Sequence, residues 1–243
     1  MFGTGIAKFF GLQGVFEEWK KKYQTARLMK EQTKRIRLRN RRKVFIIGFN
    51  KTGTTSTEAA LKELGYISGD QWMFTLLFDQ YLKGQISMDK IVDHCETAEF
   101  FQDVPFSFPN VWKAVYEKYP DALYILTVRN DENQWFHSLH KFHKKVFGDG
   151  KQVSEKDLRD AYGGSGMAYR FMMHVYPDSN LYDSDKYMAI YQKHNHDVKT
   201  FFENKTNFLE LNVAKENAYQ NLCSFLGVIP KYSSFPWLNK TPI

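Results

Sequence analysis

Cysteine is scarce in this chain of 243 residues, which contains only Cys95 and Cys223. The two lie far apart and show no metal-ligand spacing, so neither a disulfide framework nor a zinc site is expected. No apolar run approaches the ~20 residues that cross a bilayer. The stretch from Met1 to Gly14 lacks the basic start and the small-residue cleavage site of a signal peptide. These absences predict a soluble, cytoplasmic protein.

Apolar residues make up 43% of the chain and aromatic residues 16%, enough to bury one full-sized core. The formal charge of +7 is unevenly distributed. Residues 1–43 carry 13 Lys and Arg against 3 Glu, which is +10, so the remaining 200 residues carry 7 minus 10, or −3. Because the body of the chain is slightly acidic, we expect no nucleic-acid partner for it.

The basic excess belongs to an N-terminal arm, residues 1–42, which precedes a second unit, residues 43–243. Leu12, Val15 and Trp19 belong to a set of apolar residues at helical spacing, which predicts an amphipathic helix docked on the protein's own core. The basic residues that follow are interpreted as a solvated helix face. Peripheral contact with membrane phospholipid, with an anionic acceptor or with nucleic acid is the alternative.

Four short apolar runs predict buried β-strands, at residues 44–48, 98–102, 122–128 and 208–211. Helical patterns separate them, at residues 57–64, 73–83, 87–95, 109–119, 132–147, 184–204 and 215–226. This alternation predicts an α/β fold of three layers, in which helices flank a mostly parallel central sheet. Glycines recur between Gly148 and Ser165, so this segment is predicted to be a mobile loop.

The segment from Gly48 to Ser56 is predicted to be a phosphate-binding loop between a strand and a helix. Its backbone N–H groups and the positive end of the helix dipole favour an anion, and Lys51 adds a full charge. The nucleoside-triphosphate version of such a loop places its lysine directly after the second glycine. Here Thr54 follows Gly53 and the lysine lies inside the loop, so the match to an ATP site fails at its most informative residue.

The run Lys51-Thr52-Gly53-Thr54-Thr55-Ser56 resembles the 5′-phosphosulfate loop of the sulfotransferases that use 3′-phosphoadenosine 5′-phosphosulfate (PAPS). The run from Ile125 to Asn130, followed by Trp135 and Ser138, is similar to their 3′-phosphate motif. Two segments near the end, residues 222–227 and 235–241, also resemble the ends of bacterial-type members. The resemblance covers about residues 43–243.

The resemblance implies a P-loop fold, PAPS as donor co-substrate and no metal. It implies that Lys51 contacts the bridging oxygen and the 5′-phosphate, with Thr52, Gly53, Thr54, Thr55 and Ser56 around the non-bridging oxygens. Arg129 is expected to bind the 3′-phosphate with Ser138 as its partner. Ser138 follows Arg129 by nine positions instead of the usual eight, so His137 is the alternative. A small molecule, a glycan or a lipid is expected as acceptor.

Asp103 is the candidate catalytic base, since it stands where the family usually has a histidine, two residues before Pro105. An ordinary aspartate has a pKa near ~3.9 and is a weak base, so this role requires a raised pKa or a late proton transfer. The alternative is an Asp that caps the helix beginning near Phe108 or holds the loop. The surrounding aromatic residues, Phe106 among them, are expected in the core, with part of them lining an acceptor cleft.

The remaining histidines are not expected to hold a metal, because no carboxylate or cysteine joins His137, His140 and His143 at suitable spacing. His194 and His196 are predicted on a helix surface, with the lining of the acceptor pocket as the alternative. Two other functions stay open at this point. One is a kinase-like phosphotransferase using ATP, and the other is a non-catalytic nucleotide-binding protein.

Overall fold

The computed structural model of the chain describes residues 33, 35, 37–177 and 180–235. The predicted amphipathic helix of the arm lies outside the described residues, as does the final segment from Pro236 onward. At the end of the arm, Arg41 pairs with Glu99 at 2.9 Å. Lys43 is buried and donates hydrogen bonds to the backbone oxygens of Leu38 and Ala98. Lys43, the last residue of the basic run, is therefore buried against the core and does not belong to a solvated helix face.

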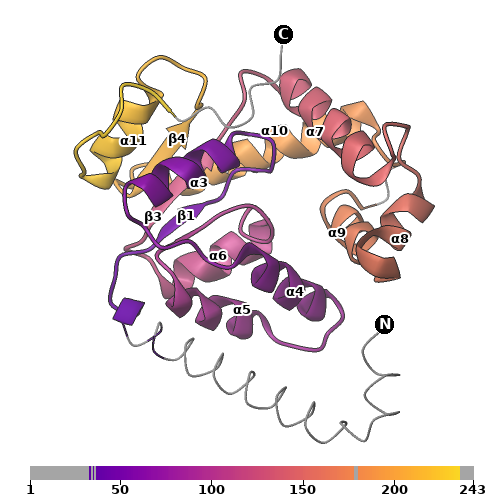
Figure 1. Cartoon of the computed structure of the whole chain (residues 1–243), viewed down its shortest axis with the longest axis horizontal. Helices are drawn as coiled ribbons and strands as arrows, with labels where there is room; N and C mark the ends of the chain where they lie inside the picture. Colours follow the sequence, from indigo (N-terminus) through magenta and orange to yellow (C-terminus); the bar gives the residue numbers. More distant parts are fainter. Residues whose placement is uncertain (1–32, 34, 36, 178–179, 236–243) are drawn as a thin grey trace, which may run out of the picture.

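The four predicted strands form one parallel sheet in the order β2-β1-β3-β4 (Figure 1). Their bounds are Val44–Ile46 for β1, Phe100–Phe101 for β2, Leu123–Thr127 for β3 and Phe208–Leu211 for β4. The strands β1 and β3 are buried along their whole length, as expected for apolar runs covered on both faces. Because all four run in the same direction, their carboxyl ends lie at one edge of the sheet.

Helices cover both faces of the sheet, as predicted. Their bounds are Thr54–Glu63 (α3), Gln71–Leu82 (α4), Met88–His94 (α5), Pro109–Lys118 (α6), Glu132–Phe147 (α7), Glu155–Gly164 (α8), Met167–Val175 (α9), Ser184–Phe201 (α10) and Ala218–Leu226 (α11). Alternate residues of β1 face opposite ways. Phe45 packs with residues of α4, α5 and α6, whereas Ile46 packs with residues of α3 and α11. Figure 1 shows these two groups of helices on either side of the sheet.

The prediction of a loop from Gly148 to Ser165 is wrong for residues 155–164, which form α8. Its start is marked by a capping box, in which the Ser154 side chain accepts from the Asp157 N–H and the Asp157 side chain accepts from the Ser154 N–H. Glycine still marks an irregularity, since Tyr162 and Gly163 have positive φ at a kink. The helix α9, also unpredicted, follows directly, and Figure 1 shows both helices at the end of the molecule opposite α11.

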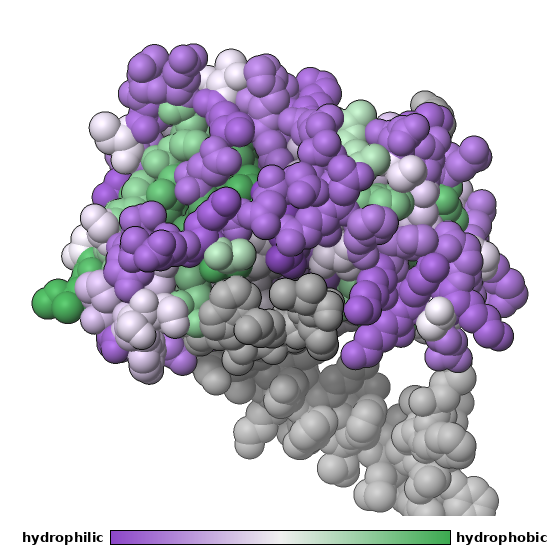
Figure 2. Space-filling view, turned by 90° about the horizontal axis from the view of Figure 1, so that it is seen from above, coloured by the Kyte–Doolittle hydropathy of each residue, from purple (hydrophilic) through white to green (hydrophobic). Residues whose placement is uncertain are grey.

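Among the described residues, no helix combines the length and the apolar character needed to span a bilayer. Figure 2 shows one face of the molecule on which hydrophilic residues predominate and apolar ones gather in smaller groups. In the part of the chain that the structure describes, buried apolar side chains form three clusters, two on the faces of the sheet and one around α7, α9 and α10.

Candidate active site

The phosphate loop lies between β1 and α3, at the carboxyl edge of the sheet. Gly53 is the N-cap residue of α3, with a φ of 104° and no side-chain capping bond. A Cβ atom there would lie 2.5 Å from Val213, so both backbone angle and space require glycine. The absence of a capping side chain leaves the N-terminal N–H groups of α3 directed at whatever occupies the loop.

Buried hydroxyl groups hold the phosphate loop to the sheet. The Thr52 side chain donates to the Phe49 carbonyl and lies 2.6 Å from the Thr127 hydroxyl on β3. Thr52 is fully buried, so its hydroxyl holds the loop to the sheet and only its backbone N–H remains for a ligand. Thr54 is buried as well, whereas Thr55 is exposed and Ser56 is half-buried. Thr55 and Ser56 are thus the two hydroxyl residues of the predicted set that are accessible to solvent.

Arg129 joins the loop to the end of β3, which brings the two predicted phosphate motifs together. Its side-chain Nε donates to the Lys51 carbonyl at 2.6 Å, and its backbone N–H donates to the Tyr191 hydroxyl at 3.0 Å. Lys51 itself has a φ of 67°, a conformation that few residues other than glycine adopt without support. The Arg129 contact supplies part of that support while leaving the terminal nitrogens of the guanidinium for an anion.

Trp135 holds the other side of the loop, a contact that sequence reasoning missed. Its indole Nε1 donates to the Asn50 carbonyl at 3.1 Å, and its ring stacks on Tyr191 with centroids 4.4 Å apart. Ser138 lies three positions further along α7 and therefore on the same side of that helix as Trp135. Ser138 is half-buried and His137 is exposed. This arrangement favours Ser138 over His137 as the partner of Arg129.

The ammonium of Lys51 lies 4.0 Å from the centre of the Phe142 ring on α7. Burial lowers the pKa of Lys51, and the nearby charge of Arg129 lowers it further, while Asp103 acts in the opposite direction. The charge of Lys51 thus interacts with both the predicted phosphate ligand Arg129 and the predicted base Asp103.

Beside Lys51 opens a cavity of about 440 Å³, formed by residues after β1 and β2 and by α4, α7, α8 and α9. Its walls are mainly apolar, and Phe142, whose ring lies against the Lys51 ammonium, is one of the lining residues. Asp103 lines the cavity directly, whereas Lys51 lies beside it, against the Phe142 ring of its wall, an arrangement that the sequence alone could not show.

Asp103 does not cap α6, because Phe108 occupies the N-cap position of that helix. Its carboxylate instead accepts from the N–H of Val104 at 2.9 Å, and its backbone has a φ of 59°. Burial raises the pKa of Asp103, and the Val104 hydrogen bond and the charge of Lys51 only partly oppose this effect. A raised pKa is what an aspartate needs to act as a base near neutral pH.

Two buried histidines border the site. His143 lines the cavity, and its Nδ1 lies 2.9 Å from the Tyr182 hydroxyl. Burial, together with the charges of Lys51 and His140, lowers the pKa of His143 to about 4, so the ring is neutral at neutral pH.

The prediction of His194 on a helix surface is wrong, because only 3% of this residue is exposed. Its Nε2 donates to the Ile47 carbonyl at 2.9 Å, and its ring stacks on Phe49 with centroids 4.3 Å apart. The signal was present in the sequence, since Tyr187, Tyr191, His194 and Val198 recur at helical spacing on the buried face of α10. His196 is exposed, as predicted. No group of three His, Cys, Asp or Glu side chains suited to a metal ion occurs within the described residues.

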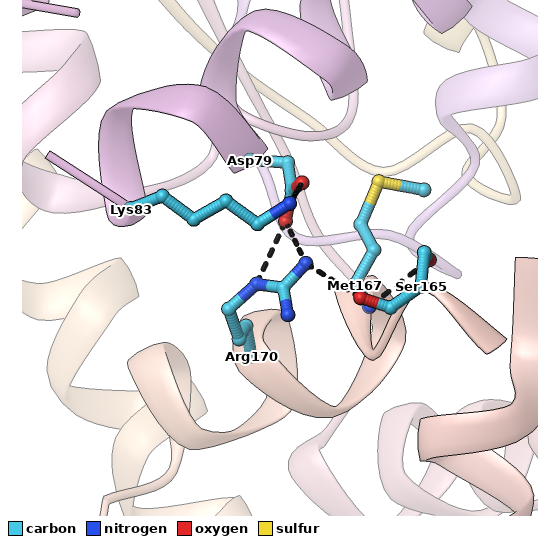
Figure 3. Close-up of polar contacts among 5 residues, drawn as sticks. All are labelled: Asp79, Lys83, Ser165, Met167 and Arg170. Carbon is cyan, nitrogen blue, oxygen red and sulfur yellow. Dashed lines mark hydrogen bonds and ion pairs between the residues drawn. The ribbon is translucent and has the colours of Figure 1, made fainter. Parts of the chain in front are cut away.

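The cavity wall formed by α9 is attached to α4 by a cluster of ion pairs (Figure 3). Arg170 donates to the buried carboxylate of Asp79 from both Nε and a terminal nitrogen, at 2.8 and 2.5 Å. Lys83 reaches the other carboxylate oxygen at 2.6 Å. Arg170 also donates to the Ser165 carbonyl at 2.9 Å, just before α9 begins. The cluster therefore holds together two of the helices that line the cavity, α4 and α9.

Asp79→Asn is expected to lower the free energy of unfolding by about 1–2 kcal/mol, because it leaves two cations without their shared anion. The estimate is reduced because Lys83 and Arg170 are partly exposed to water. Urea unfolding followed by circular dichroism measures the change. Asp160→Asn is the matched control, since Asp160 pairs with Lys156 on the surface of α8 and should cause no measurable loss. Equal losses of unfolding free energy in the two variants would show that the buried cluster stabilises the protein no more than a surface ion pair does.

Together, the parallel sheet, the uncapped helix after β1 and the two cations beside it define an α/β enzyme with a phosphate-binding loop. Residues 43–242 match the family described as Sulfotransferase domain, so the chain belongs to this family of PAPS-dependent transferases. The match confirms the resemblance seen in the motifs and covers all four strands. A search of curated proteins found no significant match.

Proposed function

We propose that the protein transfers a sulfuryl group from PAPS to a hydroxyl or amine of a molecule bound in the cavity beside Lys51. The observation that supports this most directly is the position of Lys51. It belongs to the phosphate loop, and its ammonium lies against the Phe142 ring of the cavity wall. A donor held in the loop and an acceptor held in the cavity would meet at the lysine.

The residues present fit the donor. The N-terminal N–H groups of α3, Lys51 and the hydroxyls of Thr55 and Ser56 would bind the 5′-phosphosulfate. Arg129, whose Nε donates to the Lys51 carbonyl, would bind the 3′-phosphate together with Ser138. That second phosphate group distinguishes this donor from ATP.

Charge stabilisation at Lys51 would be the main catalytic contribution. As the acceptor oxygen forms a bond to sulfur, the bond from sulfur to the phosphate oxygen breaks and negative charge develops on that oxygen. By analogy with phosphoryl transfer, a fixed cation there lowers the barrier. The acceptor proton would pass to Asp103, and 3′-phosphoadenosine 5′-phosphate would leave the loop.

Isothermal titration calorimetry with 3′-phosphoadenosine 5′-phosphate tests this proposal. We expect binding in the micromolar range or tighter, unchanged when magnesium is replaced by EDTA, because cationic side chains and N–H groups hold both phosphates. Removing the 3′-phosphate, as in adenosine 5′-phosphate, should weaken binding about 100-fold through loss of the Arg129 contact. Binding of Mg-ATP in preference to the bisphosphate would contradict the proposal and favour a kinase.

A further inference from the structure

The polarity of the cavity narrows the class of acceptor. Seven of its lining residues are phenylalanine or tyrosine, from the helices α7, α8 and α9 and from the segments after β1, before α6 and after α9: Phe49, Phe108, Phe142, Phe147, Tyr162, Phe171 and Tyr176. Leu139, Met172 and Val175 add aliphatic surface. Such walls stabilise a ligand by removing its apolar surface from water. Apolar residues outnumber the polar ones of the lining, which are Asn50, Gln71, Thr75, Asp103, Ser107 and His143, so a polyol such as a sugar would place several of its hydroxyls against apolar surface.

The charges at the cavity disfavour an anionic acceptor. Among the described residues that line it, neither Lys nor Arg occurs, and the one carboxylate is that of Asp103. His143, the remaining titratable base of the lining, is neutral because burial lowers its pKa to about 4. An anionic acceptor would therefore be repelled by Asp103. The Lys51 ammonium beside the cavity is assigned to the donor, and the lining itself offers no cation to replace the lost hydration of an anion.

The size of the cavity excludes a polymer as its full occupant. A volume of about 440 Å³ suits a single small molecule. At its mouth lie Trp72 of α4 and Tyr162 of α8, both 51% exposed and with ring centroids 5.8 Å apart. The two rings contact each other, and their exposed parts offer an aromatic surface on which a flat molecule can pack at the entrance.

From these observations we infer that the acceptor is an uncharged, compact, largely apolar alcohol or phenol. Its hydroxyl would lie at the Asp103 end of the cavity, and its apolar body would extend between α4 and α9 toward Trp72. This inference rests on the proposed sulfuryl transfer and specifies the substrate class of the same site.

A matched set of probes with labelled PAPS tests the inference. We expect sulfation of 2-naphthol with a kcat/KM about 100-fold above that of 6-hydroxy-2-naphthoate, which has the same ring system but carries a carboxylate. N-Acetylglucosamine should be at least as poor an acceptor as the naphthoate. Preferential sulfation of the sugar or of the anion would overturn the inference, and so would tight binding of 3′-phosphoadenosine 5′-phosphate without sulfation of any apolar alcohol or phenol tested. Failure of that nucleotide to bind would instead remove the proposed function itself.

Two variants of exposed residues on α4 locate the acceptor. Trp72→Ala should raise the KM for 2-naphthol about tenfold with little change in kcat, because the ring contacts the body of the acceptor and not the reacting oxygen. Leu76→Ala is the control, since Leu76 is also an exposed apolar residue of α4 but does not line the cavity. Equal KM values for the two variants would place the acceptor elsewhere. Binding of the bisphosphate nucleotide should be unchanged in both.

Discussion

Lys51→Ala is expected to lower kcat by about 1,000-fold, because no other cation lies both at the phosphate loop and beside the cavity within the described residues. Removal of a single preorganised group that stabilises developing charge commonly costs 100- to 1,000-fold. The loss should appear in kcat as well as in kcat/KM, since the charge on the leaving phosphate oxygen grows only as sulfur transfers. Radiolabelled sulfuryl transfer to 2-naphthol, measured at saturating donor, provides the value.

This loss should not arise from unfolding. Burial is the main cause of the lowered pKa of Lys51, so the folded protein bears a cost for keeping this residue charged. Lys51→Ala removes that cost, and its melting temperature should match or exceed that of the parent. Lys145→Ala, on the exposed side of α7, removes the same charge away from the loop and should keep full activity. A Lys51→Ala protein with more than a tenth of the parent activity would exclude the assigned role.

The sheet could be predicted from the sequence because each strand is a short apolar run bounded by polar residues. Both faces of β1 and β3 are covered, so the run from Val44 to Ile47 and the run from Leu123 to Val128 contain almost no polar side chain. The phosphate loop could be located for a related reason, because Gly48 and Gly53 mark places where a side chain does not fit. A Cβ at Gly48 would lie 2.3 Å from the Thr127 carbonyl oxygen.

The cavity could not be predicted, because its walls come from segments far apart in sequence. Asp103 follows β2, Phe142 lies in α7 and Phe171 lies in α9, and only the tertiary packing of these elements brings them to one cavity. The helices α8 and α9 were missed because glycine at positions 163, 164 and 166 outweighed the capping box at Ser154. The internal role of the Thr52 hydroxyl was equally hidden, since its partner Thr127 lies 75 residues away.

Whether Asp103 is the base is decided by the pH dependence of the reaction. Burial raises its pKa above the ordinary aspartate value of ~3.9, so the carboxylate form, which accepts the proton, is lost as the pH falls through that raised value. The acidic limb of kcat/KM should accordingly lie above pH ~4. A rise in pH has the opposite effect on the folding stability. The folded protein holds the proton more tightly than the unfolded chain, so ionisation of Asp103 at higher pH reduces stability.

Asp103→Asn is therefore expected to lower kcat about 100-fold or more and to abolish the acidic limb, while leaving the melting temperature at pH 7 equal or higher. Because the anion that faces the donor is removed, the affinity for 3′-phosphoadenosine 5′-phosphate should rise, a result that no unfolded or misfolded variant would give. Asp149→Asn is the matched control, since Asp149 also has a positive φ, of 51° against 59° for Asp103, but lies on the exposed loop after α7. Asparagine tolerates this conformation, so backbone strain is the same in both variants. An Asp103→Asn enzyme that retains the acidic limb with its kcat intact would move the base elsewhere, and His143 would be the next residue of the cavity wall to test.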